Sequence, residues 1–318
     1  MAVDQPLLTP VLLLTFNRPQ TTVRVLDAVR AARPTRVFVA SDGPRRDVPA
    51  DTQRVLDTRR LVESSVDWPC TVERRYSDYN QGCRQGVSAA IAWFFSRVEQ
   101  GIILEDDCVP HADFFQYCEE LLSRYRDNHR VMGISGNNPV GLRLSEPTVS
   151  YCFTRQPLIW GWATWRRAWA HYDDNLDAWQ DIRRDPTAQM RLWADPVERS
   201  WRAERYDRLA DFGVPDAWDP RWSLSVAARG GLFVTPRRNL VTNIGFGEDA
   251  THTFKQRSRK AGVPSSGILP LEHPQSVTPD VAVERQIFDR MHGGWWRRRR
   301  ILVLARRLLA GLRSRIRP

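Results

Sequence analysis

The sequence predicts an α/β protein in which a mostly parallel β-sheet is flanked by helices. Short apolar segments alternate with segments of helical periodicity through the first 110 residues, and the apolar segments end in polar residues. Strands that alternate with helices at this spacing are joined by right-handed crossovers, which produce a parallel sheet. At 318 residues, 42% of them hydrophobic, the chain can bury the core of one large domain.

Four strands and three helices are predicted in this first part. In order, they lie at 9–15 (strand), 20–32 (helix), 36–40 (strand), 52–64 (helix), 70–76 (strand), 83–97 (helix) and 101–104 (strand). Pro19 suits the first turn of the first helix, because its missing N–H is not needed there. The second strand stops at Ser41-Asp42-Gly43-Pro44, which is a turn signal.

The last of these strands ends in three consecutive acids, Glu105, Asp106 and Asp107. In an open α/β sheet, ligands bind at the carboxyl ends of the strands. Adjacent carboxylates repel one another and lose solvation, and a divalent cation bound jointly with substrate phosphates offsets that cost. The triplet therefore predicts a site for a metal ion and a diphosphate. The alternative is a solvated turn in which Asp107 or Asp113 favours the amino end of a helix.

The second half of the chain has a different character. Nine of the 13 tryptophans lie between residues 160 and 222, where they fill a mainly helical core or stack on a ligand. Further strands are predicted at 131–135, 232–234 and 240–242, and a helix at 114–126. The predicted division is a catalytic domain over 1–254, a linker or loop over 255–290, and a basic amphipathic helix over 291–318.

The net charge of +10 is concentrated in that last segment, which holds nine arginines and no acids. The rest of the chain is nearly neutral, which argues against nucleic acid as a partner. Trp295 and Trp296 precede a helical pattern with an apolar side and an arginine-rich side, which is typical of an in-plane anchor on an anionic membrane surface. The alternative is a helix that packs on the domain or on a second subunit.

The predicted location is the cytoplasm, with peripheral attachment to the inner face of the plasma membrane. The chain shows no leader pattern and no apolar run of the roughly 18–20 residues that a membrane span requires. Its five cysteines include no C-x-x-C pair, so neither a disulfide framework nor a zinc site is indicated.

Several motifs occur together in a particular order. The segment from Glu105 to Phe115 reads E-D-D, a short spacer, then D-F-F, and it lies between Ser41-Asp42-Gly43 upstream and Gly161-Trp162 and Trp218-Asp219 downstream. Over about residues 9–250 this arrangement resembles the nucleotide-sugar glycosyltransferases of the GT-A fold. It looks particularly like the branch that contains the GlcNAc-transferase initiating complex N-glycans, together with its bacterial relatives.

The resemblance implies roles for individual residues. Asp107, with His252, would hold a Mn²⁺ or Mg²⁺ ion that bridges the two phosphates of a nucleoside-diphosphate sugar, while Glu105 and Asp106 would face the ribose and the donor sugar. Asp42 would accept a hydrogen bond from the base, although an Asp before glycine also stabilises turns. The other donor-binding residues that it implies are Thr15, Asn17, Arg18, Asn80, Gly161 and Trp162.

The resemblance also implies a catalytic base, Asp219, that deprotonates the acceptor hydroxyl for in-line attack with inversion at the anomeric carbon. The family pattern is Trp-Asp-Asp-Trp, whereas this chain has Trp218-Asp219-Pro220-Arg221-Trp222, one residue longer. Asp219 could instead be a helix N-cap. The substitutes for the base are Asp216, Asp173 and Asp174.

The predicted function is that of an inverting, metal-dependent glycosyltransferase in bacterial polysaccharide or glycan biosynthesis. The favoured donor is a UDP-sugar such as UDP-GlcNAc, and the acceptor is a hydroxyl of a glycan or a lipid-linked carbohydrate. One alternative is a sugar nucleotidyltransferase, but the chain has no early glycine-rich phosphate loop and no lysine besides Lys255 and Lys260. The other is a non-catalytic carbohydrate-binding protein, for which an acid triplet would be unnecessary.

Overall fold

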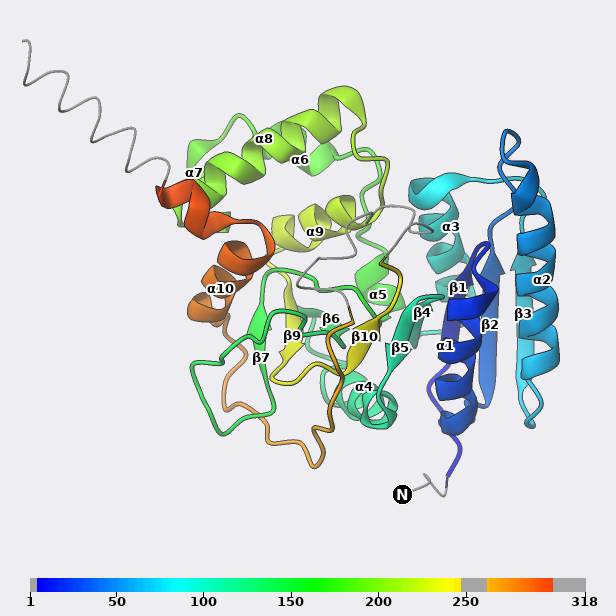
Figure 1. Cartoon of the computed structure of the whole chain (residues 1–318). Coiled ribbons are helices and arrows are strands. Elements are labelled where there is room, and N and C mark those ends of the chain that lie inside the picture. Colours follow the sequence, from blue (N-terminus) through cyan, green and yellow to red (C-terminus); the bar gives the residue numbers. More distant parts are fainter. Residues whose placement is uncertain (1–4, 247–261, 300–318) are drawn as a thin grey trace, which may run out of the picture.

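A computed structural model describes residues 5–246 and 262–299 of the chain, and it confirms the predicted α/β class (Figure 1). An eight-stranded sheet in the order β3-β2-β1-β4-β8-β6-β9-β7 crosses the molecule, and β5 pairs with β10 in a small second sheet. The strands are β1 (Val11–Thr15), β2 (Arg36–Ser41), β3 (Thr71–Tyr76), β4 (Gln100–Glu105), β5 (Cys108–Pro110), β6 (Val131–Ser135), β7 (Tyr151–Thr154), β8 (Trp162–Trp165), β9 (Leu232–Pro236) and β10 (Val241–Asn243).

Helices cover both faces of the large sheet. They are α1 (Pro19–Ala32), α2 (Pro49–Ser65), α3 (Gly82–Arg97), α4 (Ala112–Arg124), α5 (Arg166–Trp169), α6 (Asp177–Ile182), α7 (Pro186–Leu192), α8 (Pro196–Phe212), α9 (Asp219–Ala228) and α10 (Val281–Met291). Strand β1 shows the layering, because Val11 and Leu13 pack in one core with α1 and α4, and Leu12 and Leu14 pack in the other with α3 and α9. This alternation is what a strand buried on both faces requires.

The four strands of the first half are parallel, as predicted. Strand β1 lies between β2 and β4, with Thr15 beside Ser41 and Leu14 beside Glu105. The carboxyl ends of the three strands therefore meet at one edge of the sheet. The segments that follow them, which contain Arg18, Asp42 and the rest of the acid triplet, are brought to the same place.

The second half of the sheet is mixed, and it contains two strands that the sequence did not predict. Strand β8 runs antiparallel to both β4 and β6, and β7 runs antiparallel to β9. All four residues of β8, Trp-Ala-Thr-Trp, are buried, and a run this short cannot be assigned to a strand or a helix from its periodicity. The small sheet sets Asn243 beside Cys108, directly after the acid triplet.

Most of the clustered tryptophans are core residues, which is the first of the two roles expected for them. Seven of the nine are at most 9% exposed. Trp162 stacks on Trp218, with ring centroids 5.6 Å apart and an interplanar angle of 19°. Trp169 and Trp222 also pack against the ring of Trp162. This aromatic cluster joins β8 to α9, and it thereby fixes the start of α9 relative to the sheet.

The segment predicted as a linker over 255–290 differs from that expectation where the structure describes it. Residues 262–280 are mostly irregular, but Asp113 accepts hydrogen bonds from the backbone N–H groups of Ile268 and Leu269, at 2.8 and 3.1 Å. Helix α10 follows, and it buries Val283 and Ile287 completely. The spacing of four residues between them is a helical signal. The sequence did not predict the helix, because the polar residues upstream indicate a linker or loop over the whole segment.

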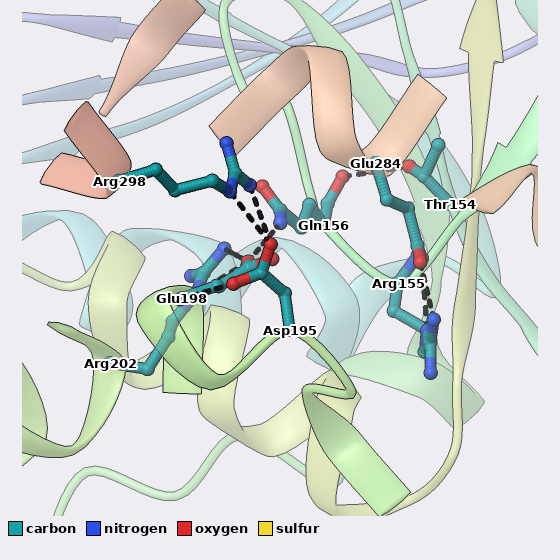
Figure 2. Close-up of polar contacts among 8 residues, drawn as sticks. All are labelled: Thr154, Arg155, Gln156, Asp195, Glu198, Arg202, Glu284 and Arg298. Carbon is teal, nitrogen blue, oxygen red and sulfur yellow. Dashed lines mark hydrogen bonds and ion pairs between the residues drawn. The ribbon is translucent and has the colours of Figure 1, made fainter. Parts of the chain in front are cut away.

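Charged side chains tie α10 and the helical residues 294–299 to the tryptophan-rich region (Figure 2). Arg298 lies 2.6 Å from Asp195, before α8, and it also pairs with Asp289 of α10. Arg155, next to β7, donates to Glu284 from its backbone N–H at 2.7 Å and pairs with the same carboxylate through its guanidinium. The C-terminal part of the described chain is therefore built into the domain.

The rest of the predicted amphipathic helix, 300–318, lies outside the described residues. Within the residues that the structure does describe, none of the helices has the length and apolarity needed to cross a membrane.

Replacing Arg155 by Met should destabilise the protein, because it leaves the Glu284 carboxylate, whose side chain is only 9% exposed, without its cationic partner. Loss of one member of a buried ion pair is expected to lower the free energy of unfolding by about 3 kcal/mol. Urea unfolding followed by tryptophan fluorescence measures this.

Two further variants make that measurement specific. Arg208→Met removes one partner of an exposed pair with Glu204, and it should cost less than about 1 kcal/mol. The double variant Arg155→Met, Glu284→Gln should recover part of the loss, since no unpaired charge remains. Equal effects for Arg155→Met and Arg208→Met would contradict the structural role of the Arg155–Glu284 pair.

Candidate active site

A cavity of about 480 Å³ opens at the edge of the sheet where β1, β2 and β4 end. Eight of the residues predicted from the sequence line it: Thr15, Arg18, Asp42, Asn80, Glu105, Asp106, Asp107 and Asp219. Trp160, Pro215, Asp216 and Trp218 contribute to the lining from the second half of the chain. The cavity thus joins the parallel half of the sheet to the tryptophan-rich region.

Three predicted residues that the structure describes are not in the lining. Asn17 is buried beside the cavity, where its amide donates to Asp51 at 2.7 Å. Gly161 and Trp162 lie in the core beneath it: Trp162 is 1% exposed, and a Cβ on Gly161 would stand 2.7 Å from the side chain of Val241. These three residues are therefore part of the packing that surrounds the cavity. His252 lies outside the described residues.

Arg18 bridges the second and third acids of the triplet. Its Nη1 lies 2.9 Å from Oδ2 of Asp107, and its Nη2 pairs with Oδ1 of Asp106. The backbone N–H of Phe16 donates to the other oxygen of Asp106, at 3.1 Å. The loop after β1 therefore holds the acids at the end of β4. The Arg18 side chain is 17% exposed, at the wall of the cavity.

Burial and mutual repulsion raise the pKa values of the first two acids of the triplet. Burial, together with the charges of Asp107 and Asp106, raises the pKa of Glu105 to about 8, although Arg18 opposes the shift. Burial also raises the pKa of Asp106 to about 6, against the attraction of Arg18. Arg18, the arginine that contacts the triplet, therefore does not balance its three carboxylates.

Asp42 clamps the loop that follows β3. Its Oδ1 accepts the backbone N–H groups of Gly43 and Gln81, at 2.9 and 2.8 Å. Its Oδ2 accepts the amide of Asn80 at 2.9 Å and the N–H of Gly82 at 3.2 Å. A carboxylate offers about four lone-pair sites, and all four are used within the protein. Recognition of a base by Asp42 would therefore require one of these hydrogen bonds to be given up, and the arrangement supports the turn-stabilising alternative.

Asp219 is the first residue of α9, and the N-cap position belongs to Trp218. The alternative that Asp219 is only an N-cap is thus not what the structure shows, and its carboxylate contributes to the cavity lining. Asp216 also lines the cavity, whereas Asp174 is paired with Arg84 at 2.6 Å and is not among the lining residues.

Asp173, the other substitute for the base, is absent from the lining as well, and its carboxylate accepts a hydrogen bond from the backbone N–H of Ala178 at 3.0 Å. Asp219 and Asp216, which line the cavity together with the triplet, therefore remain as candidate bases.

The structure adds functional candidates that the sequence did not identify. Gly245 follows β10, and a Cβ there would lie 1.9 Å from Oδ2 of Asp107, so its backbone closes one side of the acid site. Trp160 lines the cavity and packs against Phe246, with ring centroids 5.7 Å apart. The sequence pattern G-F-G at 245–247 hinted at a close backbone approach, but the pairing of β10 with β5 that produces it is not visible in the sequence.

Cys83 also lines the cavity, at the start of α3. Burial and the charges of Glu105 and Asp219 raise the pKa of its thiol to about 12. A raised pKa disfavours the thiolate, which is the nucleophilic form of cysteine. The same shift shows that Cys83 lies within electrostatic reach of carboxylates on both sides of the cavity.

The residues present suit a hard divalent ion whose coordination a substrate completes. Among residues 5–246 and 262–299, no group of three or more His, Cys, Asp or Glu side chains is arranged to hold a metal ion by itself. Mg²⁺ typically binds through one or two carboxylates together with substrate phosphates rather than in an all-protein cage. Asp107, whose side chain is 10% exposed in the cavity, provides such a carboxylate.

No known protein family and no curated protein matches the chain. Among solved structures, the chain is similar to the crystal structure of the galactosyltransferase LgtC in complex with donor and acceptor sugar analogs. The similarity has a TM-score of 0.31 and 8% sequence identity, and it covers 55% of this chain and 64% of that chain, less than two thirds of its length. A likeness this weak carries no functional inference, and it gives no support to the GlcNAc-transferase branch.

The raised pKa of Glu105 predicts a pH dependence of stability in metal-free protein. Between its ordinary value of 4.5 and about 8, the folded state keeps the carboxyl protonated while the unfolded state is ionised. Rising pH therefore favours unfolding across this window, with a slope of up to about 1.4 kcal/mol per pH unit. The Glu105→Gln variant should remove this component of the slope.

Urea unfolding in EDTA, at several values between about pH 5 and about pH 8, measures the effect. Glu146→Gln, at an exposed position, is the matched control and should leave the slope unchanged. If Glu105→Gln had the wild-type slope, the carboxyl would not be held protonated by its surroundings.

Proposed function

We propose that the chain is a glycosyltransferase that moves a sugar from a nucleoside-diphosphate sugar to an acceptor hydroxyl. The observation that carries this proposal is the composition of one cavity: three consecutive carboxylates at the end of β4 line it together with Arg18, and so do Asp219 and Asp216 from the second half of the chain. A donor diphosphate needs cationic partners, and an acceptor hydroxyl needs a base. The cavity contains a cationic group, Arg18, for the first requirement and carboxylates, Asp219 and Asp216, for the second.

The donor would bind along the edge formed by β1, β2 and β4. Arg18 would bind phosphate oxygens, because its planar guanidinium can make two parallel hydrogen bonds. A Mn²⁺ or Mg²⁺ ion held by Asp107 would supply Lewis-acid stabilisation of the charge on the departing diphosphate. Glu105 and Asp106 would face the ribose and the sugar. A UDP-sugar such as UDP-GlcNAc is the favoured donor.

The acceptor would enter from the side of α9. Asp219 would take the proton of the attacking hydroxyl as the new glycosidic bond forms, which gives inversion at the anomeric carbon. Its position at the first turn of α9 is held by the packing of Trp218 on Trp162. Proton transfer in the transition state does not require a raised carboxylate pKa.

The placement of the tryptophans weighs against a purely carbohydrate-binding role. Of the nine between residues 160 and 222, only Trp160 and Trp218 line the cavity, and most of the others are buried. A stacking platform needs exposed ring faces. The acid triplet likewise has no use in simple sugar stacking.

Thermal-shift measurements with UDP-, dTDP- and GDP-sugars, each with and without Mn²⁺, test the proposal. A ligand that binds only the folded state raises its melting temperature. We expect at least one sugar nucleotide to do so in the presence of Mn²⁺, and the same compound to be hydrolysed slowly or transferred. The Asp107→Asn variant should fold and should lose about 10²–10³-fold in turnover. Unchanged turnover of this variant would exclude Asp107 as the metal-binding residue.

The Asp219→Asn variant should lower turnover by about 10²–10⁴-fold while donor affinity stays near that of the wild type, because the group acts on the acceptor. Steady-state kinetics together with calorimetric titration of the nucleotide separate the two effects. Asp216→Asn is the matched comparison, since it removes a charge from the same wall of the cavity. A larger loss in Asp216→Asn would move the role of base to that residue.

The basic tail is proposed to hold the enzyme on an anionic membrane surface, which would suit a lipid-linked acceptor. Trp295 and Trp296 are 52% and 61% exposed at the point where the described chain ends. Each arginine near an anionic leaflet adds about 1 kcal/mol of attraction.

We expect the full chain to sediment with phosphatidylglycerol vesicles at low salt, and a chain shortened to end at Arg299 to remain in the supernatant. The shortened chain keeps Arg298 and its ion pairs, so it should unfold at the wild-type temperature. Equal sedimentation of both chains would show that the tail is not what binds the enzyme to the membrane.

A further inference from the structure

Each carboxylate oxygen of Asp106 and Asp107 already has a partner within the protein. Arg18 takes one oxygen of each residue, and the backbone N–H of Phe16 takes the second oxygen of Asp106. The second oxygen of Asp107 lies 3.3 Å from Sγ of Cys108, whose thiol can donate a weak hydrogen bond. A divalent ion that approaches Asp107 therefore meets a guanidinium already in place.

Arg18 can leave this position by moving its side chain alone. It occupies the N-cap position of α1, and its carbonyl accepts the N–H of Thr22 at 3.0 Å and the hydroxyl of Thr22 at 2.7 Å. Pro19 follows at the start of the helix. The backbone is thus fixed, while the guanidinium lies at the wall of an open cavity.

The contacts of Arg18 with the acids leave part of its hydrogen-bonding capacity unused. Its Nε is buried and has no hydrogen-bond partner among the described residues. A buried donor without a partner costs free energy. A diphosphate in the cavity would offer several charged oxygens to the same guanidinium, in the bidentate geometry that arginine favours.

We propose that Arg18 is an internal cation that competes with the divalent metal for Asp107, and that binding of the donor's diphosphate draws Arg18 away and frees the carboxylate. This inference rests on the proposed function, and it adds that binding of the diphosphate frees Asp107 for the metal ion. Two cations that share one carboxylate repel each other, so metal binds weakly while Arg18 is in place. Metal and diphosphate then raise each other's affinity by the same factor, as linkage requires.

Calorimetric titration of Mn²⁺ into nucleotide-free protein tests this competition directly, without any measurement of activity. We expect wild-type protein to bind Mn²⁺ weakly and Arg18→Gln to bind it about 10- to 100-fold more tightly, the range typical of one hydrogen bond to a charged group. Arg18→Lys should be intermediate, because an ammonium cannot bridge two carboxylates in the way a guanidinium does.

Arg75→Gln is the matched control. Arg75 lines the same cavity from β3, so this variant removes one positive charge from the cavity and leaves the bridge between Arg18 and the acids intact. It should bind Mn²⁺ as the wild type does. If Arg75→Gln tightened Mn²⁺ binding as much as Arg18→Gln, the effect would be one of net charge, and the competition would be disproved.

The coupling to diphosphate is measured by repeating the titration in saturating UDP, dTDP or GDP. With the nucleotide that binds, Mn²⁺ affinity should rise at least about tenfold in the wild type, and this increment should shrink in Arg18→Gln. Unchanged nucleotide-free Mn²⁺ affinity in Arg18→Gln would overturn the inference, whatever the nucleotides do. If Arg18→Gln binds Mn²⁺ more tightly but none of the nucleotides binds either protein, the competition stands and the proposed function fails.

Stability gives a second measurement on the same proteins. Arg18→Gln leaves the acids without their internal cation, so its melting temperature in EDTA should fall below that of the wild type. Mn²⁺ at millimolar concentration should raise it by more than it raises the wild type, since only ligands of the folded state stabilise it. If Arg18→Gln is too unstable in EDTA, Arg18→Lys provides the same comparison. If Mn²⁺ raised the melting temperature of the Arg18 variant and of the wild type by the same amount, the proposal would also be overturned.

Discussion

The site depends on the repulsion among three consecutive carboxylates that β4 delivers to one cavity. Like charges in a partly desolvated space raise one another's pKa and weaken the fold unless cations or N–H donors compensate them. The protein compensates with Arg18 and with the backbone of Phe16, both from the loop after β1. The compensation is incomplete, as the raised pKa of Glu105 shows. A site that tolerates such an imbalance is suited to a ligand that brings its own cation.

The parallel register of the sheet makes this compensation possible. Because β1 lies between β2 and β4, the loops after all three strands reach the same edge. One loop provides Arg18, the second provides Asp42, and the third provides the acids. Asp42 also organises the start of α3, because it accepts hydrogen bonds from Asn80, Gln81 and Gly82. A one-strand change in order would separate these side chains by the width of a strand, about 5 Å.

The tryptophan-rich half supplies a second part of the cavity lining. Its aromatic cluster packs β8 against α9, and the stacked rings of Trp162 and Trp218 fix the residue before Asp219. Flat, close-packed rings allow little rotation, so a carboxylate attached to this cluster has a defined position. The described C-terminal segment adds to the same rigidity, because Arg298 and Arg155 connect it to α8 and β7 regions through ion pairs. The two walls of the cavity thus come from separate parts of one packed domain.

The sequence by itself determined the α/β class, the parallel first half and the acid triplet at a strand end, because periodicity and strand boundaries are local properties. It could not determine strands β7 and β8, since a run of only four buried residues shows neither a strand nor a helix periodicity, nor helix α10. Tertiary structure alone decided that Arg18 bridges Asp106 and Asp107, which follow it by 88 and 89 residues, and that Gly245 closes the acid site. It also decided that the carboxylate of Asp42 is hydrogen-bonded to a neighbouring loop. These contacts depend on which strands become neighbours, and no local pattern encodes that choice.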